Sequence, residues 1–148
     1  MAKYGPHLTL DLVGCNPAKT TDAKFICNFF KEIPGLIGMN KIGEPHMDLY
    51  NGIHPDWDGW SVTVHIQESH ITGHFFEWGC MFLDIFSCKD FDHEGAAKMI
   101  METFEADQHA PLFKEETPET IAATKYLVDQ KSIWRYAERG LNFPPSLK

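Results

Sequence analysis

The sequence predicts a single α+β domain, a two-layer sandwich in which a mainly antiparallel sheet carries helices on one face. Three extended stretches follow one another within residues 61–86, separated only by short turn-like breaks, which is typical of an antiparallel meander. Apolar residues recur at helical spacing in residues 22–33 and 93–105. A chain of 148 residues, 43% of them hydrophobic, is long enough for one packed core but leaves little room for a second. We therefore expect one domain over residues 1–148.

The amino-terminal elements are a strand and a helix. Residues 7–13 alternate, and three leucines share one face, which predicts a half-buried strand. These leucines are Leu8, Leu10 and Leu12. Asn16-Pro17 marks a turn, and the helix predicted over residues 22–33 is expected to end at Pro34-Gly35.

The middle of the chain supplies most of the sheet. Residues 38–60 have an irregular order that predicts a short strand around 48–50 followed by a loop. Residues 61–66, 70–76 and 80–86 form the three strands of the meander. Side chains alternate across a strand, so the polar residues of the second strand, His70, Thr72 and His74, share one face.

The carboxy-terminal part is predicted to be helical. Asp92 is placed to cap the helix over residues 93–105. Thr117 followed by Pro118 is typical of a second helix start, and Gly140 is expected to stop that helix.

Charge and cysteine content exclude several classes of protein. The formal net charge is −8 and no basic patch is present, which argues against a nucleic-acid or anionic-membrane partner. The four cysteines form no C-x-x-C pair, so we expect no disulfides. With no leader and no apolar run of membrane-spanning length, a reduced, cytoplasmic protein is the simplest interpretation.

The segment from Glu68 to Cys88 carries the chemistry. A serine hydroxyl beside its own peptide bond can attack the preceding carbonyl, here that of Glu68. An imidazole nearby can move protons, and a thiol can act as an acid. If the two strands of this segment pair, His74 and Cys88 could converge near Ser69, although the register cannot be read from the sequence.

These motifs together resemble the prokaryotic S-adenosylmethionine decarboxylases, which depend on a self-made pyruvoyl group. The resemblance covers roughly residues 4–105. The matching motifs are Glu68-Ser69-His70-Ile71-Thr72-x-His74, Asp84-Ile85-Phe86-Ser87-Cys88, Gly5-x-His7-Leu8 with Cys15, and Gly59-x-Ser61. Their occurrence in one order within one chain makes coincidence a poor explanation.

The resemblance implies self-cleavage between Glu68 and Ser69, giving a β chain of residues 1–68 and an α chain of residues 69–148 headed by a pyruvoyl group. Ser61 and His74 match the family positions that assist this cleavage by hydrogen bonding and proton transfer. The pyruvoyl keto group would form a Schiff base with the substrate amine and act as the electron sink when CO2 leaves. No metal is implied.

The resemblance also implies a substrate and an assembly. The small-molecule substrate would be S-adenosylmethionine, whose decarboxylated product supplies aminopropyl groups for spermidine. Cys88 matches the general acid that reprotonates the substrate carbon, and the substrate-binding residues would be Glu77, Trp57 and Ile71. A homodimer of processed αβ protomers is expected, with substrate pockets near the subunit interface.

The sequence departs from the family pattern around the substrate. The stretch from His74 to Glu77 is one residue shorter than the His-Thr-Trp-Pro-Glu usual in the family, and residues 118–148 have no counterpart. The aromatic residue that stacks on adenine is replaced by a proline, so Trp57, Tyr50 or Trp60 would have to supply that face.

Three other interpretations stay open at this point. A pyruvoyl-dependent decarboxylase of a basic amino acid, such as arginine or ornithine, could use the acidic loop that holds His46, Asp48, Asp56 and Asp58. A non-catalytic regulatory homologue could keep the fold without the reaction. A metal site could be built from His70 and His74 with Glu77 or Cys88, although an extended segment separates such ligands more than a helix does.

Overall fold

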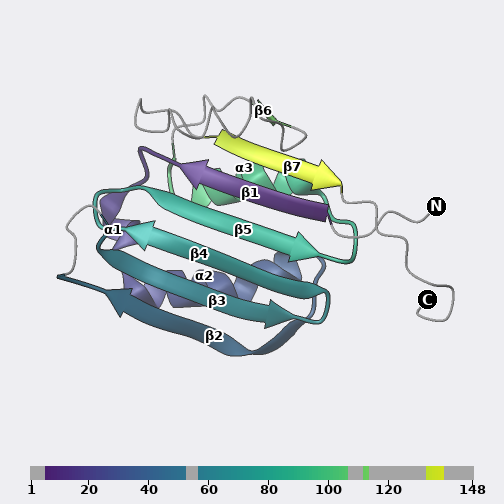
Figure 1. Ribbon diagram of the computed structural model, residues 1–148, viewed down its shortest axis with the longest axis horizontal. Helices are drawn as coiled ribbons and strands as arrows, with labels where there is room; N and C mark the ends of the chain where they lie inside the picture. Colours follow the sequence, from purple (N-terminus) through teal and green to yellow (C-terminus); the bar gives the residue numbers. More distant parts are fainter. Residues whose placement is uncertain (1–5, 53–56, 107–111, 114–132, 139–148) are drawn as a thin grey trace, which may run out of the picture.

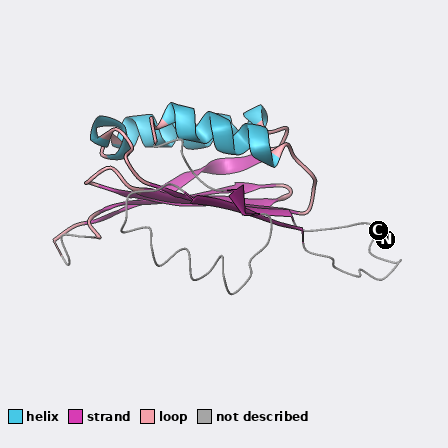
Figure 2. Ribbon diagram, turned by 90° about the horizontal axis from the view of Figure 1, so that it is seen from above, coloured by secondary structure: helices cyan, strands magenta, loops and turns pink. Residues whose placement is uncertain are grey.

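The computed structural model describes residues 6–52, 57–106, 112–113 and 133–138. The strands are β1 (Pro6–Leu12), β2 (Lys41–Tyr50), β3 (Gly59–Ile66), β4 (Ser69–Phe76), β5 (Met81–Ser87), β6 (Leu112–Phe113) and β7 (Ile133–Glu138), and the helices are α1 (Pro17–Thr20), α2 (Ala23–Leu36) and α3 (His93–Thr103). The strands form one sheet in the order β2-β3-β4-β5-β1-β7-β6, antiparallel except between β6 and β7 (Figure 1). Figure 2 shows the helices on one face of the sheet, which confirms the predicted two-layer α+β architecture. None of the described helices is long and apolar enough to span a membrane.

Strand β1 forms as its alternation predicts. It lies between β5 and β7, and Leu8, Leu10 and Leu12 are each 0% exposed in the core shared with the helices. His7 and Thr9 alternate with these leucines and are only partly buried. The buried leucines fix which face of β1 meets the helices, because a shift of one residue would turn all three away.

Aromatic rings join the helix layer to the sheet. Phe30 of α2 meets Phe75 of β4 at 5.9 Å between ring centroids, and Phe104 after α3 meets Phe29 at 5.0 Å and Phe75 at 5.3 Å. Phe30, Phe75 and Phe104 are each 0% exposed. Replacing one such phenylalanine by alanine typically costs about 3–5 kcal/mol, so this cluster holds both helices against one face of β4.

Helix α2 begins where predicted but ends later. The prediction that Pro34-Gly35 stops it is wrong, since the helix continues through Pro34 to Leu36. A proline one turn from the end removes a single backbone hydrogen bond, and its ring is buried. The stop comes from Gly38, at φ 77°, where Met39 N donates to Pro34 O at 2.7 Å and Gly38 N donates to Gly35 O at 3.2 Å. This is the Schellman pattern, which favours glycine.

The meander forms as predicted, and the strand that precedes it is longer than expected. Instead of a short strand around 48–50, β2 runs over Lys41–Tyr50, with a register shift between Ile42 and His46. Strands β3, β4 and β5 then pair antiparallel in order. Within them Thr72 of β4 lies between Thr63 of β3 and Asp84 of β5.

The predicted carboxy-terminal helix is wrong over Ile133–Glu138, which forms β7 and pairs antiparallel with β1. The remainder of that predicted helix lies outside the described residues. Ile133, Trp134 and Tyr136 are residue types that favour strands. Pairing also gives backbone partners to the outer edge of β1, which an unpaired strand would leave open.

The second face of the sheet, the helix-free face, carries no described helix (Figure 2). Buried residues alternate with more exposed ones along β3, β4 and β5, and the more exposed ones share this face. On the three strands they are Ser61, Thr63 and His65; His70, Thr72 and His74; and Phe82, Asp84 and Phe86. Hydroxyl, imidazole and carboxylate groups thus gather on one exposed face of the sheet.

Candidate active site

Ser69 lies at the first position of β4, directly after a tight turn. It pairs with Ile66, so Gln67 and Glu68 alone connect β3 to β4. Two-residue hairpin loops normally place their positive φ angles within the loop. Here Ser69 itself takes φ 154°, a conformation used almost only by glycine. The backbone is therefore strained at the residue that follows the expected cleavage bond.

The turn is anchored through the Glu68 side chain. Asn40 donates to the carboxylate from its backbone N at 3.2 Å and its side-chain Nδ2 at 3.1 Å, and Gln67 N donates to Asn40 O at 2.8 Å. Burial acts to raise the pKa of Glu68, but the Asn40 hydrogen bonds and the charge of Lys89 outweigh it and lower the pKa. An ionised, doubly hydrogen-bonded carboxylate holds the junction in one conformation.

The carbonyl group of Glu68 also has a fixed donor. Cys88 follows Ser87, which pairs with Ser69, and Cys88 N donates to Glu68 O at 2.9 Å. A backbone N–H aimed at a carbonyl oxygen stabilises negative charge that develops there during attack on the carbonyl carbon. The Cys88 side chain is exposed beside the same turn.

The thiols of Cys15 and Cys80 are buried and unreactive. Burial raises the pKa of Cys15 to about 12, with a contribution from Cys80. Burial likewise raises the pKa of Cys80 to about 12, with a contribution from the Asp11 charge. The thiolate is the reactive form, so these two side chains serve as small core residues.

This difference predicts selective labelling. At neutral pH, iodoacetamide should alkylate Cys88 in the folded protein while Cys15 and Cys80 stay unmodified, which peptide mass spectrometry measures. In denaturant all three should react, as the control. Modification of Cys15 or Cys80 at the rate of Cys88 in the folded protein would contradict their burial.

A second group of residues forms around His74. His74 faces Ser61 across β3 and β4, with 2.8 Å between His74 Nδ1 and Ser61 Oγ. Its Nε2 lies 3.0 Å from the carbonyl oxygen of Trp57. A carbonyl only accepts hydrogen bonds, so Nε2 carries the hydrogen and neutral His74 presents its Nδ1 lone pair to the Ser61 hydroxyl. His74 is thus preset as a proton acceptor.

The two groups lie at opposite ends of β4. We name Glu68, Ser69 and Cys88 the cleavage end, and Ser61 and His74 the histidine end. Five positions separate residues 69 and 74, which is roughly 17 Å along a strand. The expected convergence of His74 with Ser69 therefore does not occur within one chain, whereas Cys88 does lie beside the Glu68–Ser69 junction.

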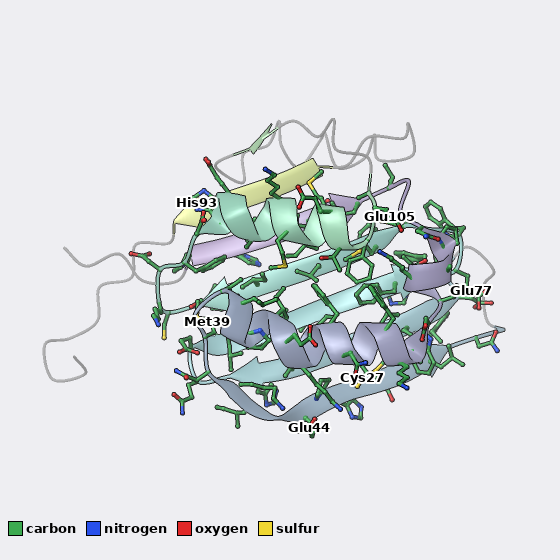
Figure 3. The ribbon with its side chains drawn as sticks, turned by 180° about the vertical axis from the view of Figure 1, so that it is seen from behind. Cys27, Met39, Glu44, Glu77, His93 and Glu105 are labelled. Atoms are coloured by element: carbon green, nitrogen blue, oxygen red, sulfur yellow. The ribbon has the colours of Figure 1, made fainter. Side chains whose placement is uncertain are left out.

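Figure 3 gives the same separation from the helix side. Met39, whose sulfur lies 3.7 Å from Ser87 Oγ at the cleavage end, is labelled at one end of the sheet, and Glu77 at the other. Glu77 sits in the turn from β4 to β5, where its N donates to Asp58 O at 3.1 Å. The predicted ribose ligand is therefore also at the histidine end.

The remaining residues that were predicted to bind substrate differ in how exposed their side chains are. Trp57 is 56% exposed and lies next to the histidine end. Trp60 packs against the core, and Ile71 is 0% exposed beneath the sheet, so the Ile71 side chain supports the core and does not reach the helix-free face. Trp78, which had no predicted role, is 58% exposed beside Glu77, and this adjacency in sequence is the signal that could have found it.

Two adjacent depressions mark the helix-free face. One, of about 520 Å³, is lined by Ser69 and His70, and the other, of about 430 Å³, by Ser61 and His74. Thr63 and Thr72 line both. The cleavage end and the histidine end therefore open onto one continuous surface.

Two residues without a predicted role, His7 and Asp84, lie next to the cleavage end. His7 Nε2 contacts Asp84 Oδ2, and Asp84 Oδ1 lies 3.6 Å from His70 Nε2. The sequence signal for Asp84 is a carboxylate at an alternating position within an otherwise apolar strand.

The residues behind two alternative functions, a basic amino-acid decarboxylase and a metal site, give those functions less support than the Glu68–Ser69 junction gives self-cleavage. His46 Nε2 lies 2.9 Å from Asp48 Oδ2, and Asp58 accepts from Gly52 N, so both carboxylates already have partners, while Asp56 lies outside the described residues. Within the described part of the chain, no group of three or more His, Cys, Asp or Glu side chains is arranged to hold a metal ion.

Comparison with known proteins places the chain in a family. The model of the S-adenosylmethionine decarboxylase family matches residues 6–111. The S-adenosylmethionine decarboxylase proenzyme of Clostridium botulinum is 33% identical over 93 residues, covering 61% of this chain and 75% of the relative. The proenzymes of Bacillus velezensis (32% over 108 residues; 72% and 81%) and Parasynechococcus marenigrum (30% over 125 residues; 81% and 91%) are also similar. The chain belongs to the S-adenosylmethionine decarboxylase family.

Proposed function

We propose that this protein is a self-processing, pyruvoyl-dependent S-adenosylmethionine decarboxylase. It would cut its chain between Glu68 and Ser69 and release CO2 from S-adenosylmethionine, giving the decarboxylated product used in spermidine synthesis. The observation that carries the proposal is the Glu68–Ser69 junction, where a strained serine follows a carbonyl that accepts a hydrogen bond from Cys88 N at 2.9 Å. A solvated turn of no function needs neither feature.

The junction fits formation of a pyruvoyl group from the chain itself. Ser69 Oγ attacks the Glu68 carbonyl carbon, and the amide becomes an ester as the Ser69 nitrogen gains a proton. Loss of the Ser69 Cα proton then expels the Glu68 carboxylate and leaves dehydroalanine. Its imine tautomer reacts with water, ammonia leaves, and residue 69 ends as a pyruvoyl group. No oxidant or metal takes part in this sequence.

The second reaction uses the same end of the sheet. The carbonyl of a pyruvoyl group condenses with a substrate amine and accepts the electron pair that departing CO2 leaves behind. Cys88, exposed beside residue 69, returns a proton to the substrate carbon. Trp57 offers an aromatic face to adenine, and Glu77 a carboxylate to the ribose hydroxyls.

The separation of the two ends supports a homodimer as part of this proposal. His74, Trp57 and Glu77 are all at the end of β4 that is remote from Ser69. Two chains stacked through their helix-free faces, with β4 strands antiparallel and the two-fold axis between positions 71 and 72, would set each Ser69 opposite the partner's His74. Each complete site would then combine one cleavage end with the partner's histidine end.

Self-cleavage is the direct test of processing. The purified protein should run as two fragments on a denaturing gel, and the second should have the mass of residues 69–148 with a pyruvoyl group and resist amino-terminal sequencing. Ser69→Ala should remain one chain, since no hydroxyl is left to attack Glu68. An intact wild-type chain with serine at position 69 would end the proposal and favour the non-catalytic homologue.

A parallel assay tests the substrate. CO2 release from S-adenosylmethionine, arginine and ornithine should be compared with the same processed protein. We expect release from S-adenosylmethionine alone, because exposed Trp57 suits adenine and Asp48 is already paired with His46. Release from arginine or ornithine would instead establish the basic amino-acid decarboxylase, leaving the processing proposal in place.

A further inference from the structure

The hydroxyl of Ser69 has a proton acceptor within its own chain. Ser69 Oγ lies 3.1 Å from Nδ1 of His70, the next residue. This nitrogen is far closer to the attacking oxygen than His74, which lies at the other end of β4. The acyl shift at Ser69 therefore has a potential base that does not depend on a second subunit.

The His70 ring is held in place from two sides. Its Nε2 is 3.6 Å from Asp84 Oδ1, within ion-pair distance, and the ring stacks on Phe86 at 5.7 Å between centroids with 28° between planes. Asp84 is in turn held by His7 Nε2, and the His7 ring meets the edge of Phe86 at 5.3 Å. Three strands, β1, β5 and β4, thus contribute to one chain of contacts that ends at Ser69.

The charge of Asp84 favours one tautomer of His70. At 3.6 Å the pair is too long for a hydrogen bond, but a negative carboxylate next to Nε2 favours the ring hydrogen on that nitrogen. Neutral His70 then presents the Nδ1 lone pair to the Ser69 hydroxyl, the arrangement that a general base requires. His74 has the same tautomer, with Nε2 facing the Trp57 carbonyl and the Nδ1 lone pair directed at Ser61.

We propose that His70 is the general base of the acyl shift and that Asp84 and His7 position it, which leaves His74 of the proposed dimer for the later loss of the Ser69 Cα proton. The inference rests on the proposed self-cleavage and divides its two proton transfers between two histidines. One histidine acts within its own chain, and the other through the partner.

Every proton transfer of the acyl shift takes place between groups of the same chain. Ser69 Oγ forms a bond to the Glu68 carbonyl carbon while its proton passes to His70 Nδ1. The oxygen of Glu68, now negatively charged, keeps the hydrogen bond from Cys88 N. When the bond from Glu68 carbon to Ser69 nitrogen breaks, His70 returns the proton to that nitrogen. His70 ends neutral, as it began.

His70→Gln tests the base, because glutamine keeps hydrogen-bonding capacity but cannot take up a proton. General bases contribute roughly 10²–10⁴-fold, so cleavage should slow by at least about 100-fold. His65→Gln is the matched control, since His65 is the cross-strand neighbour of His70 on the same face and should cleave at the wild-type rate. Thermal unfolding of uncut His70→Gln against Ser69→Ala, which also stays whole, checks that the His70→Gln precursor folds.

Hydroxylamine identifies the step that is blocked, because it cleaves esters and spares amides. His74→Ala should accumulate the ester, and hydroxylamine should split it between residues 68 and 69. His70→Gln should stay whole in hydroxylamine, since its ester does not form. If His70→Gln splits as readily as His74→Ala, or processes within a few-fold of wild type, the role of His70 is overturned. A wild-type chain that never cleaves removes the proposed function instead.

A second set of variants covers the positioning residues and any folding defect. Asp84→Asn should also slow cleavage, because asparagine lacks the negative charge that favours the ring hydrogen on His70 Nε2. In a Ser69→Cys chain the thiol loses its proton far more readily than a hydroxyl does. Adding His70→Gln or Asp84→Asn to that chain should therefore slow cleavage by less than one tenth of the slowing that the same substitution causes in the chain with Ser69. A purely structural role would give equal slowing in both backgrounds and would contradict the inference.

Discussion

Co-expression of the Ser69→Ala and His74→Ala chains should restore cleavage that each chain lacks alone. In a mixed dimer, the intact Ser69 of the His74→Ala chain faces the intact His74 of its partner, so this chain should be cut. The Ser69→Ala chain has no hydroxyl at position 69 and stays whole. With random pairing, about half of the His74→Ala chains should be processed. Different affinity tags on the two chains let a denaturing gel measure each one separately.

The control removes only the His74 side chain that the Ser69→Ala chain would supply to its partner. A chain carrying both Ser69→Ala and His74→Ala forms the same mixed dimer but offers no His74 to the partner, so cleavage should stay at the level of His74→Ala by itself. Gel filtration should show that the mixed species is a dimer. If the single-mutant pair shows no more cleavage than this control, His74 does not act across an interface, and a monomeric wild-type protein that cleaves would exclude the stacked dimer altogether.

Much of the fold could be predicted because local patterns decide it. The leucines at positions 8, 10 and 12 alternate, and all three are fully buried in β1. Asp22 and Asp92 precede apolar residues at helical spacing, and both cap helices by accepting backbone hydrogen bonds. Each of these features is a short-range preference that the tertiary structure reinforces.

The errors arise where distant contacts outweigh local preference. Pro34 predicts a helix end, but its ring is buried and the helix continues to Leu36, where the turn at Gly38 ends it. The segment Ile133–Glu138 follows a helix start signal, yet it forms a strand because β1 offers an open edge. Neither the burial of Pro34 nor the pairing of residues 133–138 with β1 can be predicted from the spacing of residues in the sequence.

The candidate site was predicted in its parts but not in its arrangement. Ser69, Cys88 and Ser61 could be identified from motif order, and the pairing of Ser61 with His74 follows from the register of β3 and β4. The separation of Ser69 from His74 follows from the predicted strand itself, because five positions along a strand span roughly 17 Å, whereas the position of Cys88 beside Glu68 comes only from the observed register. If Ser69 and His74 cooperate, the second chain of the proposed dimer would be what brings them together.

Replacing Cys88 by alanine should separate processing from catalysis. The two functions proposed for this residue use different atoms: its backbone N–H stabilises the Glu68 carbonyl during cleavage, and its thiol returns a proton after CO2 leaves. Cys88→Ala keeps the N–H, so the chain should still be cut into residues 1–68 and 69–148. Decarboxylation should fall by about 10²–10⁴-fold, as expected for loss of a general acid, and product analysis should reveal misprotonation.

Cys88→Pro supplies the reverse change, because proline has no N–H to donate to Glu68 O. Loss of one such donor typically costs about 10²–10³-fold, so this precursor should cleave slowly. The position follows the last residue of β5, Ser87, where a proline interrupts no ladder pair. Unfolding measured against uncut Ser69→Ala tests whether the proline chain folds. Normal turnover by processed Cys88→Ala would remove the thiol from the reaction, and cleavage of folded Cys88→Pro at the wild-type rate would remove the N–H from processing.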